Sequence, residues 1–284
     1  MCLEIVEFFV AVISVAVIGE GDTCHGSISG CDIGNLIAIP ALLCAIAQGR
    51  GSRAPAGSQF DIFASLASDE ITYLNKVPTS SCSFASRTII VEEGRPVSGI
   101  IGIVSGWAAC MRNLVDGRRQ IIGFVLPGDI LDGSWSGREH IGQSVVAMNT
   151  VEAIMIPESV VVEIPNRCPN LNTALTKQAS RNYAILEEHT VRLGRRTAIE
   201  KIAHLLLEID HRLSAVQLSD NGRFVVEATQ QELADALGLT SVHVNRTLKM
   251  LREQGLIAVH GRLIALKDRA RLTELAEFGV EYLE

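Results

Sequence analysis

The sequence predicts an α+β protein in which an N-terminal antiparallel β-roll of the cupin type is followed by a long helix and a C-terminal winged helix-turn-helix. Three observations predict this order. Short β-branched runs separated by glycines fill residues 83–157, a stripe with helical period covers residues 170–193, and two short amphipathic helices meet at Gly238. Because the apolar period changes near residue 170, the chain is expected to change there from sheet to helix.

Length and charge limit the classes of function. The 284 residues, of which 48% are hydrophobic, are enough for two ordinary domains. The formal net charge is -7. A protein that coats nucleic acid without selectivity is normally basic, so any nucleic-acid binding here is expected to be local and selective.

The cysteines favour a reducing environment. They are odd in number, and no two of them form a CxxC pair: Cys2, Cys24, Cys31, Cys44, Cys82, Cys110 and Cys168. This spacing supports neither a zinc ribbon nor a thioredoxin-like redox motif. A cytoplasmic location is therefore expected.

Residues 1–57 are expected to be an N-terminal extension of uncertain structure. The apolar run over residues 3–18 is interrupted by two glutamates and has no basic residue before it, unlike a secretory signal. A second apolar run, residues 33–47, contains Pro40 and is shorter than the roughly 20 residues of a spanning helix. Residues 48–58 have the composition of a linker. No membrane partner is predicted, and the segment is either an appendage or the product of a start assigned too far upstream.

Residues 58–168 are predicted to form the β-roll, a sensor domain. Ten glycines between positions 94 and 142 separate β-branched runs at 88–91, 100–104, 120–125, 144–146 and 153–156. Short strands between frequent turn signals indicate an antiparallel sandwich or roll. Asp116-Gly117 is a hairpin signal. Short helical turns are expected before the first strand of the roll, at residues 60–63 and 68–74.

Residues 169–195 are predicted to form a dimerisation helix. Its stripe recurs at spacings of three, four and seven and consists of Leu171, Leu175, Asn182, Leu186, His189 and Leu193. Such a stripe packs either on the helix's own domain or against a second copy in a parallel dimer. The polar members Asn182 and His189 favour a homodimer, because polar side chains are more easily accommodated between two chains. A second helix, expected over residues 196–213, leads into the winged domain of residues 196–284.

The most specific functional signal lies at residues 229–252. Thr229 and Glu232 form a capping box that starts one helix, and Gly238 allows a sharp turn after it. Thr240 is expected to cap the next helix. The apolar positions of that second helix are predicted to be buried, namely Val242, Val244, Leu248 and Leu251.

The remaining side chains of the second helix are polar or basic: Ser241, His243, Asn245, Arg246 and Lys249. Between residues 240 and 252 there are three basic residues and no acidic one. Two short strands then follow, with His260-Gly261 as their turn. A solvated helical hairpin would share some of these features. The added hairpin favours a winged helix-turn-helix, which places a recognition helix in the major groove of double-stranded DNA.

These motifs together resemble those of the CRP/FNR family of bacterial transcription regulators. The likeness is carried by SGWA at 105–108, DGRRQI at 116–121, LPGD at 126–129, LGLT to NR over 237–246, and GLI at 255–257. It covers roughly residues 60–266 and leaves residues 1–57 outside. The resemblance implies a cyclic-nucleotide-binding-like roll and a dimeric, sequence-specific regulator. Its partners would be a near-palindromic operator and RNA polymerase.

The resemblance also assigns DNA contacts. It implies that Arg246 reads a guanine, and a guanidinium does match guanine O6 and N7 bidentately, with about 1–3 kcal/mol of discrimination. Val242 stands where the family usually has glutamate, so the half-site is expected to differ from the family's standard one. The further base-reading candidates are Ser241, Val242, His243 and Asn245, and the phosphate-contact candidates are Thr229, Gln230, Thr240, Lys249 and Arg262.

A cyclic nucleotide is not expected in the roll. Gly133 stands at or near the family's ribose-binding glutamate, and Gln143-Ser144 stands where the family has Arg-Ser. Glutamine is uncharged, so a phosphate would be buried without a cation. Arg138 could substitute for the missing arginine because the loop lengths differ.

An iron–sulfur cluster is not expected either, and no other cofactor or metal is predicted. The family's cluster-binding branch has closely spaced N-terminal cysteines, whereas Cys24, Cys31 and Cys44 are far apart. Ile154 stands where the roll should supply a further cysteine. Cys82, Cys110 and Cys168 are expected to be small core residues. The neighbours Glu139 and His140 are expected to be solvated rather than to bind a metal.

The sequence thus predicts a DNA-binding transcription regulator and not an enzyme, because it has no activated nucleophile, phosphate loop or metal spacing. A nucleotide-gated enzyme would need a catalytic domain for which the chain has no room. The alternative is a small-molecule or redox receptor that acts mainly through a protein or membrane partner. Salt distinguishes the two, because binding through several DNA phosphates weakens steeply as salt rises.

Overall fold

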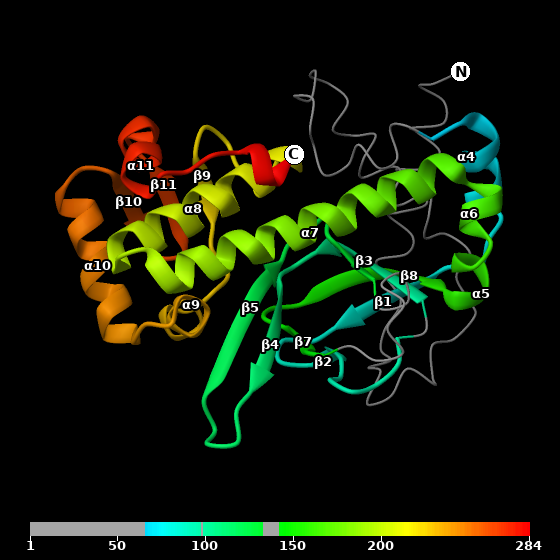
Figure 1. Cartoon of the computed structure of the whole chain (residues 1–284), viewed down its shortest axis with the longest axis horizontal. Coiled ribbons are helices and arrows are strands. Elements are labelled where there is room, and N and C mark those ends of the chain that lie inside the picture. Colours follow the sequence, from blue (N-terminus) through cyan, green and yellow to red (C-terminus); the bar gives the residue numbers. More distant parts are fainter. Residues whose placement is uncertain (1–65, 98, 133–141) are drawn as a thin grey trace, which may run out of the picture. The chain divides into compact units, whose positions relative to one another are not determined.

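The computed structural model describes residues 66–97, 99–132 and 142–284 (Figure 1). The chain divides into two units, residues 1–32 and 33–284, and every described residue belongs to the second. The predictions for residues 1–57, for the linker and for a helical turn at residues 60–63 lie outside the described residues.

Among the described residues, eight antiparallel strands form the roll. The first helix described is α4 (Ser68–Leu74), and the strands of the roll are β1 (Ser80–Phe84), β2 (Ile89–Val91), β3 (Gly99–Ser105), β4 (Ala108–Asn113), β5 (Arg119–Val125), β6 (Ile130–Asp132), β7 (Ser144–Ala147) and β8 (Val151–Pro157). They pair into two four-stranded sheets, in the orders β1-β8-β3-β6 and β2-β7-β4-β5. The predicted roll is confirmed, and so is the helical turn at residues 68–74.

Five of these strands, β2, β3, β5, β7 and β8, coincide with the predicted β-branched runs. The strands β1, β4 and β6 were not predicted, because SSCSF, AACMRN and ILD carry little β-branched character. The hairpin signal at Asp116-Gly117 is confirmed. Gly117 has a φ of +84°, and the amide of Leu114 donates to the carbonyl of Arg118 at 2.7 Å. The β4–β5 hairpin projects beyond the neighbouring strands (Figure 1).

Gly106 shows why one glycine of the roll cannot be replaced. Its φ is +81°, and a Cβ at this position would lie 2.1 Å from the carbonyl oxygen of Thr150. Only glycine accepts both the left-handed backbone and the close approach. The turn fixed by Gly106 brings Trp107 into the core, where it is 4% exposed.

Four helices follow the roll: α5 (Glu158–Val161), α6 (Ile164–Arg167), α7 (Pro169–Arg195) and α8 (Ala198–Ala215). The long helix predicted over residues 170–193 is confirmed as α7, which starts with a proline in its first turn, where no amide donor is required. The helix predicted over residues 196–213 is α8, which begins at Ala198 rather than Arg196. Thr197 is its N-cap residue and forms a capping box with Glu200.

The stripe predicted for dimerisation does not lie on one free surface of α7. Leu171 and Leu175 are 3% and 4% exposed and pack in the chain's own core with Leu74 and Ile164. His189 is 6% exposed. These three side chains have almost no surface left for a partner, so their assignment to a two-chain contact is wrong. Asn182 and Leu186 are exposed and Leu193 is half-buried, so for them the assignment stays a prediction.

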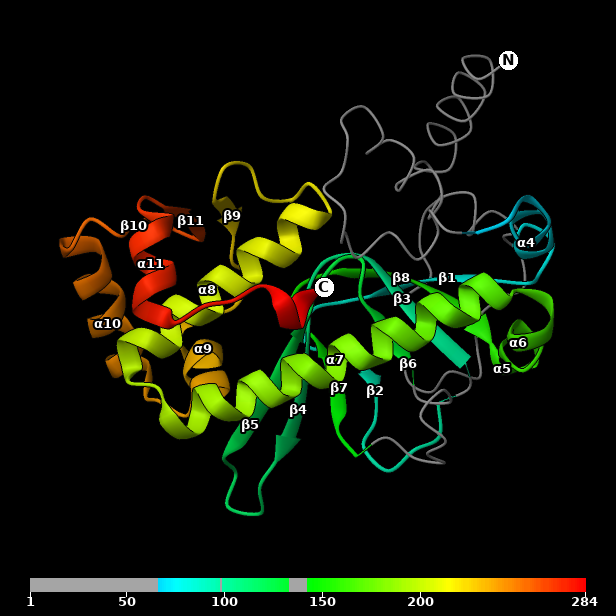
Figure 2. The ribbon, with the colours of Figure 1, turned by 45° about the horizontal axis from the view of Figure 1, so that its top comes forward.

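The C-terminal domain contains the expected winged helix-turn-helix. Its remaining elements are β9 (Arg223–Val225), α9 (Gln230–Leu237), α10 (Ser241–Glu253), β10 (Ile257–His260), β11 (Leu263–Leu266), α11 (Arg269–Ala276) and η3 (Glu281–Leu283). The predicted wing hairpin is β10–β11. It gains a third strand, β9, which was not predicted and which pairs with β11. Figure 2 shows η3 beside α7, and these two elements are in contact.

One hydrophobic cluster joins the roll to the C-terminal domain. It contains Trp107, Phe124 and Leu126 from the roll together with Leu206 of α8 and Leu237 of α9, all of them at most 5% exposed. Since a buried core resists small displacements, this shared cluster holds the helix-turn-helix against the roll.

Candidate nucleic-acid interface

The helix-turn-helix is built by the local signals seen in the sequence. The amide of Thr229 donates to Glu232 Oε2 at 2.7 Å, and the amide of Glu232 donates to Thr229 Oγ1 at 3.2 Å. Gly238 ends α9 with a φ of +62°. Thr240 Oγ1 then accepts from the amide of His243 at 3.2 Å and caps α10. The predicted capping box, turn and second cap are all confirmed.

Burial along α10 differs from the prediction at two positions. Val244, Leu248 and Leu251 are buried as expected, but Val242 is 77% exposed, so its predicted burial is wrong. Thr247 is 2% exposed and was not expected to be buried. Positions 244, 247, 248 and 251 follow the helical period, whereas position 242 is about 200° away from position 244 at 100° per residue.

The outer face of α10 carries the predicted base-reading side chains. Asn245 and Arg246 are exposed, while Ser241 and His243 are half-buried. Asn245 Nδ2 donates to Gln230 Oε1 at 3.1 Å, which ties this face to the start of α9. Within the described part of the chain, no hydrogen bond or ion pair of the Arg246 side chain is found. Its guanidinium is therefore available to a molecule outside the chain.

The predicted phosphate contacts lie on the surface around α10. Thr229, Gln230 and Thr240 are exposed at the N-terminal ends of α9 and α10, where helix dipoles favour anions. Lys249 Nζ lies 3.7 Å from Glu253 Oε1 on the exposed surface. Arg262, next to the wing turn, pairs with Glu227. Surface pairs of this kind are weak, so both cations can be recruited by a phosphate.

The expected absence of cofactors from the roll stays a prediction, since Gly133, Arg138, Glu139 and His140 lie outside the described residues. Gln143 is half-buried, and Ser144 Oγ accepts from the amide of Glu93 at 3.2 Å. Among the residues that are described, no cluster of three or more histidine, cysteine or acidic side chains suits a metal ion.

The three cysteines among the described residues, Cys82, Cys110 and Cys168, are buried or half-buried. Ile154, which stands where the family resemblance would require a further cysteine, is 4% exposed and lies on β8. Cys110 lies on β4, which belongs to the other sheet. Burial raises the pKa of the Cys110 thiol to about 12, and burial also raises that of Cys168. A thiol with a raised pKa is a poor nucleophile and a poor metal ligand at neutral pH. Cys82, on β1, is half-buried.

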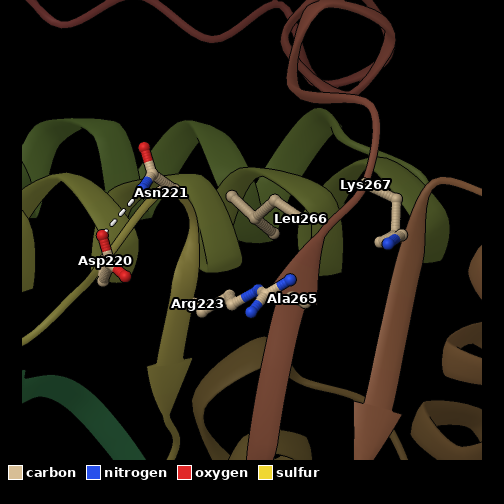
Figure 3. Close-up of a pocket in the computed structure, with 6 residues that line it drawn as sticks. All are labelled: Asp220, Asn221, Arg223, Ala265, Leu266 and Lys267. Atoms are coloured by element: carbon tan, nitrogen blue, oxygen red, sulfur yellow. Dashed lines mark hydrogen bonds between the residues drawn. The ribbon is translucent and has the colours of Figure 1, made fainter.

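A pocket of about 310 Å³ lies in the C-terminal domain (Figure 3). It is lined by Asp220, Asn221, Arg223, Ala265, Leu266 and Lys267. Asn221 Nδ2 donates to Asp220 Oδ1 at 2.7 Å. The pocket lies at the end of β11 opposite to the wing turn, so it is separate from the face of α10. Its lining is mostly polar, unlike that of a typical small-molecule site.

Two models of known protein families match the chain, one in the roll and one in the C-terminal domain. Residues 200–275 match the model of the Crp-like helix-turn-helix domain, and residues 81–167 match that of the cyclic nucleotide-binding domain. The nitrogen fixation regulation protein FixK of Azorhizobium caulinodans is 32% identical over 193 residues, which are 68% of this chain and 77% of that protein. The transcriptional activator protein FnrL of Cereibacter sphaeroides is 32% identical over 74% of this chain and 85% of its own length.

The structure of FixK2 from Bradyrhizobium japonicum matches with a TM-score of 0.63 and 28% identity, over 69% of this chain and 96% of that one. The chain belongs to the CRP/FNR family of transcription regulators. Like them, it joins a cyclic-nucleotide-binding-like roll to a helix-turn-helix DNA-binding domain. Among the described residues of this CRP/FNR regulator, no helix is long and apolar enough to cross a membrane.

Buried charges, which the sequence argument missed, connect the two domains of this CRP/FNR chain. Arg212 of α8 is 5% exposed and pairs with Asp129 of the roll, which is 6% exposed. Arg212 Nη2 also donates to the carbonyl of Phe124 at 3.0 Å, and the amide of Leu126 donates to Asp129 Oδ2 at 2.7 Å. Asp129 Oδ1 and Arg212 Nε have no hydrogen-bond partner within the described chain. The pair is thus buried and only partly satisfied.

Further contacts join β5 of the roll to α9. Arg119 pairs with Asp235, and Gln120 Nε2 donates to the carbonyl of Ala236 at 3.3 Å. Arg119 and Gln120 belong to the DGRRQI motif that carried the family resemblance. The motif therefore has a structural role, because it holds the first helix of the helix-turn-helix on the roll.

A second buried group joins α7 to α8. Arg192 pairs with Glu208, and Arg192 Nε donates to His204 Nδ1 at 3.2 Å. His204 Nε2 lies 3.1 Å from Glu188 Oε1. A histidine that accepts at Nδ1 and donates from Nε2 is in its neutral form. The hydroxyl of Tyr282 donates to Glu208 Oε2 at 3.2 Å.

Electrostatics agree with a neutral His204. Burial, together with Arg192 and Arg196, lowers the pKa of His204 to about 3. Burial and Arg192 likewise lower the pKa of His189 to about 4. Burial would raise the pKa of Glu208, but Arg192 and Arg212 outweigh this and lower it. Burial raises the pKa of Asp129 despite Arg212.

We expect the substitution Arg212→Met to lower the free energy of unfolding by about 3–5 kcal/mol, because it leaves Asp129 buried without its cation. Urea denaturation measures the loss. The matched control is Arg118→Met, which removes an exposed ion pair of 2.7 Å with Asp116 and should change stability by less than about 1 kcal/mol. In the double variant Asp129→Asn, Arg212→Met, part of the loss should be recovered. Equal effects of Arg212→Met and Arg118→Met would contradict the role given to the buried pair.

We expect stability to fall as the pH drops below about 6.5. The unfolded histidines bind protons at their ordinary pKa, whereas folded His204 and His189 stay neutral until their pKa values of about 3 and 4. Each contributes a loss of at most about 1.4 kcal/mol per pH unit in this window. Thermal unfolding between pH 7 and pH 4 measures the slope. The variant His204→Gln, which no longer titrates, should have a shallower slope, and an unchanged slope would show that other groups cause it.

Proposed function

We propose that this protein binds a near-palindromic DNA operator as a homodimer, with α10 of each copy in one major groove. The observation that carries the proposal is the exposed Arg246 on the outer face of α10, which has no partner within the described chain. The match to the Crp-like helix-turn-helix domain supports it. A cytoplasmic location and contact with RNA polymerase belong to the same proposal, since one relative is named as a regulation protein and another as a transcriptional activator.

Arg246 is proposed to read guanine. A guanidinium presents two parallel N–H donors that match guanine O6 and N7 in the major groove. Asn245 is proposed to read a neighbouring base, with Ser241 and His243 beside it. The exposed cation Lys249 and the capping residues Thr229 and Thr240 would contact phosphates, which fix the position of the protein but carry no sequence information.

The homodimer is proposed to form through an outward row on α7. The row consists of Thr176, Ala179, Tyr183, Leu186 and Thr190, all of them exposed and spaced by four and three residues. Tyr183 is 64% exposed and Leu186 is 43% exposed, which is unusual for large apolar side chains. A spacing of three and four residues is the heptad pattern of two-stranded coiled coils. A second copy of α7 is thus the partner that fits this row.

We propose no catalytic role, because the relatives are named as a nitrogen fixation regulation protein and a transcriptional activator. Signal binding to the roll would change the relative orientation of the two helix-turn-helix units. Such a change is a shift in the populations of two conformations of the protein. A ligand can shift this equilibrium only by as much as its affinity differs between the two conformations. The proposal does not name the ligand. No cyclic nucleotide or iron–sulfur cluster is part of it.

The test of DNA binding begins with selection of bound genomic fragments by the full-length protein, which yields the operator. Arg246→Ala should then lower operator affinity by about 1–3 kcal/mol per half-site and remove the preference over scrambled DNA. Lys249→Ala is the matched control, because loss of a phosphate contact should weaken binding to both DNAs about equally. Equal wild-type affinity for operator and scrambled DNA would end the proposal. Binding that does not weaken with salt would favour a protein or membrane partner instead.

The test of the dimer places charges on the outward row. The double variant Tyr183→Glu, Leu186→Glu should sediment as a monomer at concentrations where the wild type is a dimer, because four carboxylates would face one another across the contact. Lys177→Glu is the control, since Lys177 is exposed on the side of α7 away from the row. A double variant that remains dimeric would place the contact elsewhere.

A further inference from the structure

Val242 is an apolar side chain that the fold leaves almost uncovered. It is 77% exposed, whereas Val244, two residues later in the same helix, is completely buried. Val242 is the second residue of α10, directly after Ser241. The core therefore does not require a valine at this position, and its β-branched side chain does not favour the helix over alanine.

The position of Val242 on the recognition helix distinguishes it from a scattered surface valine. Asn245 and Arg246 follow it by three and four residues, so the three side chains lie on the same face of α10. The first turn of a recognition helix is the part that contacts base edges. No acidic residue lies between positions 240 and 252, so this face is compatible with the negative charge of DNA.

We propose that Val242 reads the 5-methyl group of a thymine in the major groove. The inference rests on the DNA binding proposed above and adds a specificity determinant to it. The thymine methyl is the apolar group that the four unmodified base pairs present in the major groove, beside donors and acceptors. Valine has neither donor nor acceptor in its side chain. Contact with this methyl group is thus the one form of direct base readout open to it.

The neighbouring amide supports an A·T pair near this methyl group. Gln230 Oε1 accepts one hydrogen of Asn245 Nδ2 at 3.1 Å. The second hydrogen of Nδ2 and the oxygen Oδ1 remain for adenine N7 and N6, which is the bidentate contact of asparagine with adenine. The outer face of α10 then offers one group for guanine, one for adenine and one for thymine.

The test uses the full-length protein and its selected operator, in which each thymine is replaced in turn by deoxyuridine. This change removes the methyl group and keeps the base pairing. At one symmetric position we expect a loss of affinity of about fourfold per half-site, or roughly 15-fold for both, from the usual free energy of burying one methylene-sized group. Fluorescence anisotropy of labelled duplexes measures it. The variant Val242→Ala should bind the thymine and uracil operators with more nearly equal affinity.

The control variant is Val225→Ala, which shortens another exposed valine of the same domain, on β9. It should keep the preference of the wild type for thymine. At the same base position, a 5-methylcytosine·guanine pair should bind more tightly than a cytosine·guanine pair, since the methyl group is the same. A response to 5-methylcytosine without a response to thymine would overturn the assignment to thymine.

Two other results would overturn the inference. One is a wild-type protein that binds every uracil-substituted operator as tightly as the original. The other is a Val242→Ala variant that keeps the full preference for thymine, because another side chain would then read the methyl group. Failure of the proposed DNA binding itself is distinguishable from both, since no operator would then be selected and no affinity difference between sequences would exist.

Discussion

The orientation of the recognition helix depends on the buried pair of Arg212 and Asp129. A buried ion pair is a weak source of net stability, because the loss of hydration offsets the attraction between the charges. It does penalise every arrangement in which one charge is buried without the other. Arg212 belongs to α8 and Asp129 to the roll, so the penalty applies to movement of the C-terminal domain relative to the roll. The shared apolar cluster supplies the stability of this junction, and the pair restricts its geometry.

The same helix α8 also carries the contact to α7. Glu208, four residues before Arg212, binds Arg192 of α7 and lies 3.5 Å from Arg212 Nη1. One carboxylate therefore lies between two arginines that come from different helices. A displacement of α7 would disturb the environment of Glu208 and, through it, that of Arg212. The roll, the proposed dimer helix and the helix-turn-helix all meet at α8, which would give the proposed signal a physical route from the roll to the proposed DNA-reading face.

The parts of this architecture that the sequence predicted are those set by local chemistry. The caps at Thr229 and Thr240, the left-handed Gly238 and the hairpin at Asp116-Gly117 each depend on a few neighbouring residues, so their conformation could be derived without knowledge of the fold. The pair of Arg212 and Asp129 could not, because 83 residues separate its members. One signal was present. Arg212 lies on the apolar stripe of α8 with Ile202, Leu205 and Ile209, where a charge requires a buried partner.

The two errors on α7 and α10 have a common physical cause. Helical period shows which residues share a face, but it does not show what covers that face. Leu171 and Leu175 were assigned to a partner chain and are covered by the chain's own core. Val242 was assigned both to the core and to base reading; it is exposed, so the first assignment is wrong and the second stays a prediction. Each helix has one face that the chain covers, and in the function proposed above its other face binds a molecule outside the chain. An apolar residue that the finished fold leaves exposed, such as Val242 or Tyr183, is consequently better evidence for such a molecule than the pattern that first drew attention to the helix.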